Sequence, residues 1–291
     1  MLKFKPMNAV SPAKEFAAEV EGMDFTQPLD QEQIIAIKEG MERFAVLIFK
    51  EQTLTDDQQL SFSRCFGELE QSIKSSLDKT NPLRVAPEIA DISNLDINNR
   101  IQASDDRARF FSMGNQLWHS DSSFKRVPAS YSILSGRDVP DRGGNTEFAD
   151  MRAAYDTLDD DLKKEVEDLI CKHSLIYSRF QLGFDDFTDK ELKAFQPVRQ
   201  PLVRAHPVTE RKSLFLSSHA GEIIGWPTPE ARALLRDLIE HATQRKFVYA
   251  HKWSNNDLVM WDNATTMHRG RRFESKNVIR DLRRTTIAGV K

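Results

Sequence analysis

Three residues in this chain, His119, Asp121 and His268, could together hold a metal ion. In an extended segment, residues two positions apart point to the same side, so His119 and Asp121 can reach one ion while Ser120 faces away. His268 is the best-placed distant histidine to supply a third ligand. Two imidazoles and one carboxylate on one face of a metal, with the other positions open, are typical of non-heme Fe(II) oxygenases. The His-x-Asp triplet alone is a weak signal, since a chain with seven histidines can contain one by chance.

The remaining histidines have weaker claims as ligands. We expect His241 to be a packed or surface residue of a helix, and His173 and His251 to occupy ordinary surface or strand positions. His206 and His219 could line a pocket, although histidine is also a common structural residue.

Two arginines near the C-terminus offer fixed positive charge. Arg280 and Arg284 are four residues apart, so in a strand both lie on the face that Leu282 uses, while Arg283 points the other way. Guanidinium groups bind carboxylates in a bidentate manner, which favours an anion site. The alternative is a solvated basic strand end.

Composition excludes several classes of protein. The net charge of −3 over 291 residues gives no electrostatic case for nucleic acid or anionic membrane. The longest apolar runs are far too short to span a membrane, and the N-terminus lacks the apolar core of a signal peptide. The two cysteines, Cys65 and Cys171, are expected to be reduced and mostly buried. We therefore expect a cytoplasmic protein that forms a single domain over residues 1–291.

Helix signals lie at four places. Capping boxes at Asp30–Gln33 and Thr55–Gln58 predict two helices near the N-terminus, the second ending near Gly67. A helix is predicted over residues 160–170, and another begins at Thr228, which we expect to be its N-cap because proline follows.

Short strands dominate the rest of the chain. Runs rich in β-branched and aromatic residues predict strands over residues 45–49, 131–139, 145–148, 213–218, 247–253, 258–261 and 284–290. Many short strands with helical flanks favour a sandwich or jelly roll packed by helices. The intervening residues 72–113 are polar and irregular, so they form either a lid or pocket wall or a disordered surface loop.

Several segments, in order, resemble one enzyme family. From about Glu19 to the C-terminus, the chain is similar to the taurine dioxygenase family of Fe(II)- and 2-oxoglutarate-dependent dioxygenases, and within it most similar to the 2,4-dichlorophenoxyacetate branch. The segments that carry the resemblance are residues 115–124, 143–155, 241–249, 257–263, 268–272 and 280–286. The resemblance implies a mainly β fold with flanking helices around a double-stranded β-helix, the jelly-roll or cupin-like core.

The resemblance also implies roles for the metal and co-substrate residues. His119, Asp121 and His268 would hold Fe(II). Thr146 and Arg280 would bind the distal carboxylate of 2-oxoglutarate, because placing the keto group on the metal depends on anchoring the far end. The remaining co-substrate contact would be Trp253, and O2 would take the last open position on the metal.

Substrate contacts are implied less directly. Arg284 would reach the anionic end of the primary substrate or share the charge of the co-substrate. Asn115 matches a position near the pocket, and Ile73 and Lys74 are candidate contacts from the pocket wall.

The expected activity is hydroxylation of the carbon next to the ether oxygen of an aryloxyacetate-type acid, giving a phenol, glyoxylate, succinate and CO2. Within the same family, an alkylsulfonate dioxygenase that releases sulfite from a taurine-like compound is the alternative. Outside it, a non-catalytic metal-binding jelly roll or a zinc hydrolase with the same ligands stays open. The expected partner is a small anionic molecule, and the resemblance implies a homo-oligomer.

Overall fold

The computed structural model of the chain describes residues 2–7, 15–25, 27–73, 75 and 82–290. Its largest sheet has seven strands that come from both ends of the sequence. Their spatial order is β1 (Lys3–Pro6), β2 (Ala18–Glu21), β3 (Val46–Phe49), β13 (Leu258–Asp262), β5 (Tyr131–Asp138), β15 (Asp281–Thr286) and β4 (Ile89–Ser93). All neighbours run antiparallel except β2 and β3.

A second antiparallel sheet carries residues of the candidate site. Its order is β12 (Val248–His251), β6 (Thr146–Asp150) and β14 (Thr266–Gly270). His268 on β14 pairs with Phe148 on β6, and it also forms an isolated antiparallel bridge with His119. This bridge joins two segments that are far apart in sequence.

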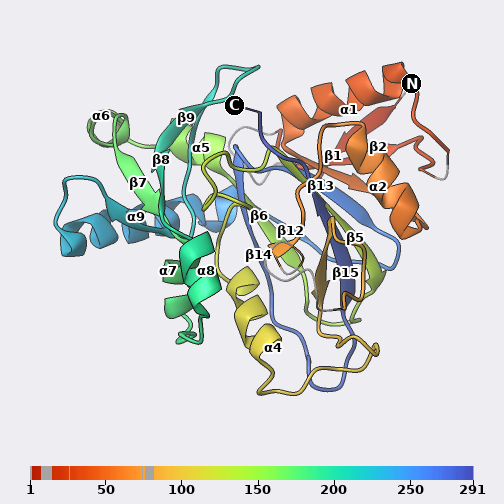
Figure 1. Ribbon diagram of the computed structural model, residues 1–291. Coiled ribbons are helices and arrows are strands. Elements are labelled where there is room, and N and C mark those ends of the chain that lie inside the picture. The colour runs from red at the N-terminus through yellow and green to blue at the C-terminus, as the bar shows by residue number, and fades with distance from the viewer. Residues whose placement is uncertain (1, 8–14, 26, 74, 76–81, 291) are drawn as a thin grey trace.

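Two small sheets lie to one side with several helices. One contains β11 (Ala220–Ile223), β7 (Ile170–His173) and β8 (Val198–Pro201), and the other β10 (Lys212–Leu214) and β9 (Val203–Ala205). Figure 1 shows α6, α7, α8 and α9 gathered around β7 and β8, whereas α1 and α2 lie beside the large sheet. The helices are α1 (Gln31–Phe44), α2 (Asp56–Arg64), α4 (Arg107–Ser112), α5 (Met151–Asp156), α6 (Asp160–Val166), α7 (Leu175–Phe180), α8 (Asp189–Ala194) and α9 (Thr228–Ala242), with 3₁₀ turns η1 (Met113–Gln116) and η2 (Arg245–Phe247).

The core between the two main sheets is aromatic. Phe148 of β6 packs against Trp261 of β13 with ring centroids 5.4 Å apart, and Leu282 of β15 and Trp253 belong to the same buried cluster. Trp261 also lies 4.6 Å from the ring of His268. The packed sheets therefore form a rigid support directly behind that histidine.

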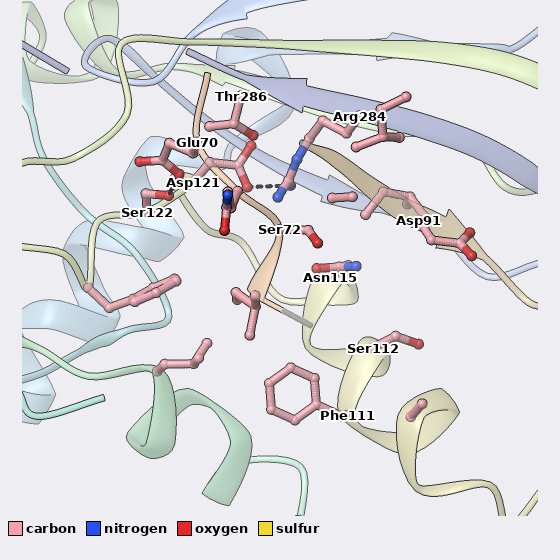
Figure 2. Close-up of a pocket in the computed structure, with 18 of the residues that line it drawn as sticks. Glu70, Ser72, Asp91, Phe111, Ser112, Asn115, Asp121, Ser122, Arg284 and Thr286 are labelled. Carbon is pink, nitrogen blue, oxygen red and sulfur yellow. Dashed lines mark hydrogen bonds and ion pairs between the residues drawn. The ribbon is translucent and has the colours of Figure 1, made fainter. Parts of the chain in front are cut away.

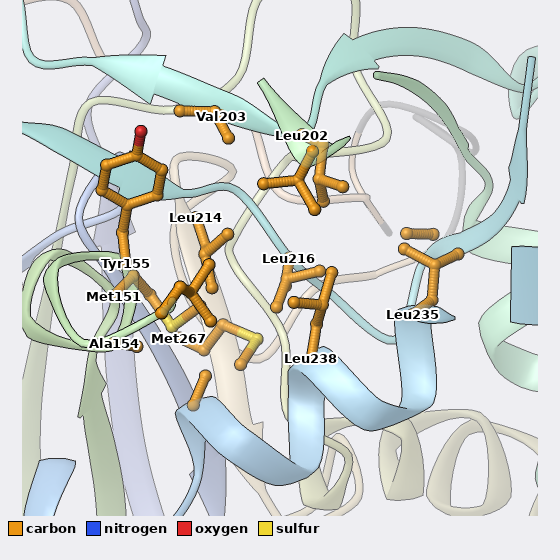
Figure 3. Close-up of a cluster of buried hydrophobic side chains, with 14 of the residues drawn as sticks. Met151, Ala154, Tyr155, Leu202, Val203, Leu214, Leu216, Leu235, Leu238 and Met267 are labelled. Carbon is orange, nitrogen blue, oxygen red and sulfur yellow. The ribbon is translucent and has the colours of Figure 1, made fainter. Parts of the chain in front are cut away.

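A separate apolar cluster supports the helical side. Leu235 and Leu238 of α9 face Leu214, Leu216 and Met267, as Figure 3 shows. The helical spacing of the leucines places them on one face of α9, which explains why this helix packs on the sheets.

Most sequence-predicted elements are confirmed. Both capping boxes form, with Asp30 accepting from the Gln33 amide and Thr55 from the Gln58 amide. The mainly β architecture with flanking helices also agrees with the expectation. Both cysteines are free thiols, and Cys171 is buried while Cys65 is partly exposed.

Some expectations were wrong in detail. The last strand is Asp281–Thr286 rather than 284–290. The predicted helix 160–170 ends at Val166, and β7 begins at Ile170. In place of the predicted strand 213–218, the strand covers Lys212–Leu214. Pro227 occupies the N-cap position of α9, with no side-chain cap hydrogen bond, so Thr228 is not the cap. His173 and His251 lie at strand positions, in β7 and β12, which was one of the two alternatives expected, and both are buried.

Residues 72–113 are more regular than the polar sequence indicates. Their described part contains β4, which pairs with β15, and α4. The sequence hides β4 because its residues alternate only weakly. No helix within the described ranges is long and apolar enough to cross a membrane.

Candidate active site

His119, Asp121 and His268 come together as one buried cluster. Nε2 of His119 lies 3.9 Å from Oδ1 of Asp121, and Nε2 of His268 lies 3.7 Å from Oδ2. The three donor atoms all lie within 4.8 Å of one another. Two nitrogens and one carboxylate oxygen at this spacing fit one divalent ion of the Fe(II) type and leave its other positions open.

The two histidines are prepared to act as neutral ligands. Nδ1 of His119 lies 2.7 Å from the Leu117 carbonyl, so this nitrogen carries the proton and Nε2 keeps a lone pair. Burial lowers the pKa of His119 and lowers that of His268 well below its usual value. Both rings are therefore neutral at neutral pH, each with one N–H and one free nitrogen lone pair.

Asp121 is held as an ionised carboxylate. Oδ2 accepts a hydrogen bond of 2.7 Å from the Ser132 hydroxyl, and its backbone amide donates to Oδ1 of Asn263 at 3.3 Å. Burial would raise the pKa of Asp121, but the Arg284 guanidinium, together with the neighbouring imidazoles and the Ser132 hydroxyl, outweighs burial, and the pKa falls to about 2. Asn263 is fixed in turn by the Trp261 indole N–H at 3.0 Å.

Arg280 is a buried cation without an acidic partner. Only 8% of the residue is exposed, and its guanidinium donates to the Gly144 carbonyl at 3.1 and 3.3 Å. No carboxylate pairs with it in the part of the chain that the structure describes. Burial lowers the pKa of Arg280 to about 10, so it is still charged at neutral pH. A buried unpaired charge is costly, which favours an anionic ligand at this place.

Thr146 and Trp253 contact each other. The indole Nε1 of Trp253 donates to Oγ1 of Thr146 at 3.0 Å. Thr146 follows Gly144 by two residues, and Gly144 accepts from Arg280. The Arg280 guanidinium and the Trp253 indole thus both donate to the short segment that contains Gly144 and Thr146.

A cavity of about 630 Å³ opens onto the metal cluster. Its lining includes His119, Asp121, Arg284, Asn115 and Ile73. Figure 2 shows Asp121 and Arg284 on one wall, with Asn115 and Phe111 of the η1–α4 segment across from them. This volume is large enough for a substituted aromatic acid.

The other predicted residues lie elsewhere. His268, Thr146, Trp253 and Arg280 do not line this cavity. Lys74 lies outside the described residues. Of the predicted co-substrate residues, Arg284 therefore lines the open pocket, whereas Thr146, Trp253 and Arg280 do not.

Several pocket residues escaped the sequence analysis. Arg179 and Phe111 line the cavity, and Ser132 and Asn263 orient Asp121. Their positions depend on strands and helices that are distant in sequence. Of the two histidines expected as possible pocket residues, His219 lines the cavity and His206 does not.

Comparison with known proteins decides the family. Residues 8–286 match the family described as taurine catabolism dioxygenase TauD, TfdA family. The chain belongs to this family. It is 45% identical over 271 residues to an alpha-ketoglutarate-dependent 2,4-dichlorophenoxyacetate dioxygenase of Cupriavidus pinatubonensis, covering 93% of this chain and 94% of that one. A (S)-phenoxypropionate/alpha-ketoglutarate dioxygenase of Sphingobium herbicidovorans is 38% identical, covering 87% and 85%.

Among solved structures, the crystal structure of AAD-2 in complex with Mn(II) and N-oxalylglycine is 49% identical, with a TM-score of 0.95 over 100% of this chain and 99% of that one. The double-stranded β-helix fold is thereby confirmed, as is the predicted class of 2-oxoglutarate-dependent, non-heme iron dioxygenase with Fe(II), 2-oxoglutarate and O2.

Proposed function

We propose that this protein hydroxylates the carbon next to the ether oxygen of an aryloxyalkanoate such as 2,4-dichlorophenoxyacetate. The observation that carries the proposal is the full-length similarity to dioxygenases of that name. The resulting hemiacetal collapses to a phenol and glyoxylate, so the ether is cleaved without a hydrolytic residue.

We assign the metal to His119, Asp121 and His268. With Fe(II), 2-oxoglutarate and O2 bound, the site supplies oxidative decarboxylation to succinate and CO2 coupled to hydroxylation of a nearby C–H bond. The protein holds the metal-binding side chains in position. The Ser132 hydroxyl orients Asp121, the Leu117 carbonyl orients His119, and the aromatic core behind His268 keeps that ring in place.

The co-substrate residues are assigned from charge and contact. Arg280 would bind the distal carboxylate of 2-oxoglutarate, with Thr146 supplying a hydroxyl and Trp253 fixing that hydroxyl. Arg284 lies beside Asp121 and would share the charge of the co-substrate or of the substrate.

The substrate pocket combines apolar walls with polar groups near the metal. Ile73, Phe111, Phe124 and Leu175 supply the apolar surface, and Asn115 a hydrogen-bonding amide. An aromatic ring in such a pocket would exclude water from the metal while the ether carbon faces it. Segment 72–113 would then act as a pocket wall of a single domain over residues 1–291.

A substrate panel tests the proposal. Purified protein with Fe(II) and 2-oxoglutarate is supplied with aryloxyacetates or alkylsulfonates, and phenol, sulfite and succinate are measured. We expect phenol from the aryloxyacetates. Sulfite release would favour the alkylsulfonate alternative, and product formation with zinc in place of iron would favour a hydrolase.

Two further expectations accompany this function. We propose a cytoplasmic location, because both cysteines are free thiols. A homo-oligomer also stays a prediction, which sedimentation of the purified protein would test.

A further inference from the structure

The basic side chains around the cavity are mostly neutralised by the protein itself. Arg84 pairs with Asp91 and Asp281, and Lys125 with Glu70. Arg107 pairs with Asp186 and Glu191, and Arg284 with Asp121. These cations stabilise the pocket wall and the metal ligands, so they already have anionic partners.

Arg179 of α7 differs from them. Only 5% of this residue is exposed, and Nη1 lies 3.0 Å from the Ser178 hydroxyl. Nε is buried without a hydrogen-bond partner, and no carboxylate pairs with the guanidinium within the described ranges. Burial lowers the pKa of Arg179 to about 10, which leaves it charged at neutral pH. A buried charge of this kind needs an anion.

Phe111 and Gly114 pack closely around the guanidinium of Arg179. Its Cζ lies 4.5 Å from the centroid of the Phe111 ring on α4. A side chain at Gly114 of η1 would lie only 2.2 Å from Cζ and Nη1 of Arg179, so glycine is what allows the close approach. The turn η1 also contains Asn115, three residues before the His119 segment begins at Trp118. Arg179 thus packs against the turn that precedes the His119 segment.

A guanidinium that packs its face on an aromatic ring still presents its N–H groups in the plane of the fork. In this orientation it can bind a carboxylate with two parallel hydrogen bonds. Arg179, Phe111, His119 and Asn115 all line the same cavity, so an anion at Arg179 lies within the substrate pocket.

We propose that Arg179 binds the carboxylate of the primary substrate and thereby selects aryloxy acids over neutral aryl ethers. This assignment rests on the proposed function. It leaves Arg280 for the distal carboxylate of 2-oxoglutarate and Arg284 for Asp121 and the co-substrate. The aryl group then extends along the apolar wall of the cavity, toward Leu83, Val85 and Ile89.

The test compares wild type with Arg179→Met, which removes the charge but keeps much of the apolar stem. Steady-state kinetics are measured with an aryloxyacetate, its neutral primary amide and 2-oxoglutarate. We expect the KM for the acid to rise roughly 10- to 100-fold, the KM for 2-oxoglutarate to stay within about twofold, and the preference for acid over amide to disappear. The affinity of the acid for the protein loaded with Mn(II) and N-oxalylglycine, measured by calorimetry, should fall by the same factor.

Arg204→Met is the matched control. Arg204 on β9 also lies over a phenylalanine ring, 4.2 Å from the Phe215 centroid, but it does not line the cavity. We expect the KM values of the Arg204→Met variant to match those of the wild-type protein. An unchanged KM for the acid in Arg179→Met, or an equal loss for acid and amide, would overturn the proposal.

If Arg179→Met does not fold, Arg179→Lys decides, because it keeps the charge but not the bidentate fork. A several-fold higher KM for the acid alone supports the proposal, and an unchanged KM refutes it. The activity of the wild-type protein distinguishes a failure of the proposed function from a failure of the role of Arg179. Without phenol from any aryloxy acid in wild type, the proposed function fails. With phenol in wild type and no change in the variants, only the role of Arg179 fails.

Discussion

The Arg284 guanidinium donates a hydrogen bond to Oδ1 of Asp121, the same carboxylate whose Oδ2 accepts from Ser132. Both oxygens of Asp121 therefore have fixed partners before any metal is present. The adjacent positive charge, together with the neighbouring imidazoles and the Ser132 hydrogen bond, outweighs burial and keeps the pKa of Asp121 at about 2. The carboxylate is thus ionised and oriented for a divalent ion.

Asp121→Ala should remove metal binding, because no other carboxylate of the described chain joins the two histidines in the cluster. We expect Mn(II) affinity, measured by calorimetry, to fall by more than about 100-fold. Ser132→Ala keeps all three ligands and removes only an orienting hydroxyl, so a loss of about 10-fold is expected. Normal turnover by Asp121→Ala would exclude this residue as a ligand.

Arg280→Met and Arg284→Met should separate the cation proposed to anchor the far end of 2-oxoglutarate from the cation that pairs with Asp121. We expect Arg280→Met to raise the KM for 2-oxoglutarate by roughly 100-fold. Thermal stabilisation by N-oxalylglycine should also disappear in Arg280→Met, while the ligand-free variant is at least as stable as wild type because a buried unpaired charge is removed. Arg284→Met should affect 2-oxoglutarate less than Arg280→Met does. Equal effects of the two substitutions would refute this division.

The sequence predicted the parts of the site that follow local rules. Period-two alternation in a strand placed Arg283 opposite Arg284, and the structure agrees, since Arg283 pairs with Asp56 on the outer side while Arg284 contacts Asp121. The pairing of His119 with His268 was inferred only as the best candidate, because a bridge between distant segments has no local signature.

Burial was harder to predict than secondary structure. His173 occupies a strand position in β7, one of the expected alternatives, but the sequence gives no sign that it is buried and stacks on Phe215 with ring centroids 5.5 Å apart. Arg179 was missed because its neighbours Phe111 and Gly114 come from a segment far away in the sequence. Such contacts depend on tertiary packing, which no periodicity encodes.

His173→Phe tests the effect of burying a neutral imidazole. Burial, with a contribution from Arg204, lowers the pKa of His173 to about 3, so between pH 6.5 and 3 the unfolded chain binds a proton that the folded protein does not. The stability that this histidine contributes is complete above pH 6.5 and is lost as the pH falls toward 3. The free energy of unfolding in urea should fall by about 2 kcal/mol more for wild type than for the variant between pH 7.5 and pH 5. Equal losses would contradict burial of a neutral ring.

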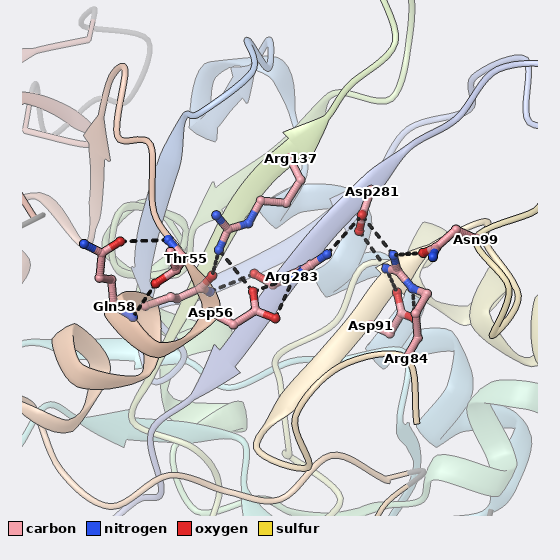
Figure 4. A network of polar contacts seen from close by, with 10 residues as sticks. Thr55, Asp56, Gln58, Arg84, Asp91, Asn99, Arg137, Asp281 and Arg283 are labelled. Atoms are coloured by element: carbon pink, nitrogen blue, oxygen red, sulfur yellow. Dashed lines mark hydrogen bonds and ion pairs between the residues drawn. The ribbon is translucent and has the colours of Figure 1, made fainter. Parts of the chain in front are cut away.

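Arg84→Leu tests how segment 72–113 is held. Arg84 binds Asp91 of β4 and Asp281 of β15 with two hydrogen bonds to each, as Figure 4 shows. The arginine side chain is only 6% exposed, and its removal leaves Asp91 without this partner and Asp281 with the longer contact of 3.5 Å to Arg283. The substitution should therefore destabilise the fold by about 3 kcal/mol. The substrate KM should also rise, because Arg84 lines the cavity.

Arg64→Leu is the control for that substitution. Arg64 pairs with Glu88 at 3.5 Å, but its side chain is 53% exposed, so the free energy of unfolding should change by less than about 0.5 kcal/mol. Similar losses for Arg64→Leu and Arg84→Leu in urea unfolding would mean that the Arg84 network does not stabilise β4 on β15.

The most direct test of the central claim is the stoichiometry of one reaction. Purified protein with Fe(II), 2-oxoglutarate and O2 is given 2,4-dichlorophenoxyacetate, and phenol, glyoxylate and succinate are measured together over time. The account predicts that the three products form in equal amounts and that phenol release stops when either O2 or 2-oxoglutarate is left out. Phenol release without O2 or 2-oxoglutarate, or succinate formation without any phenol, would contradict it.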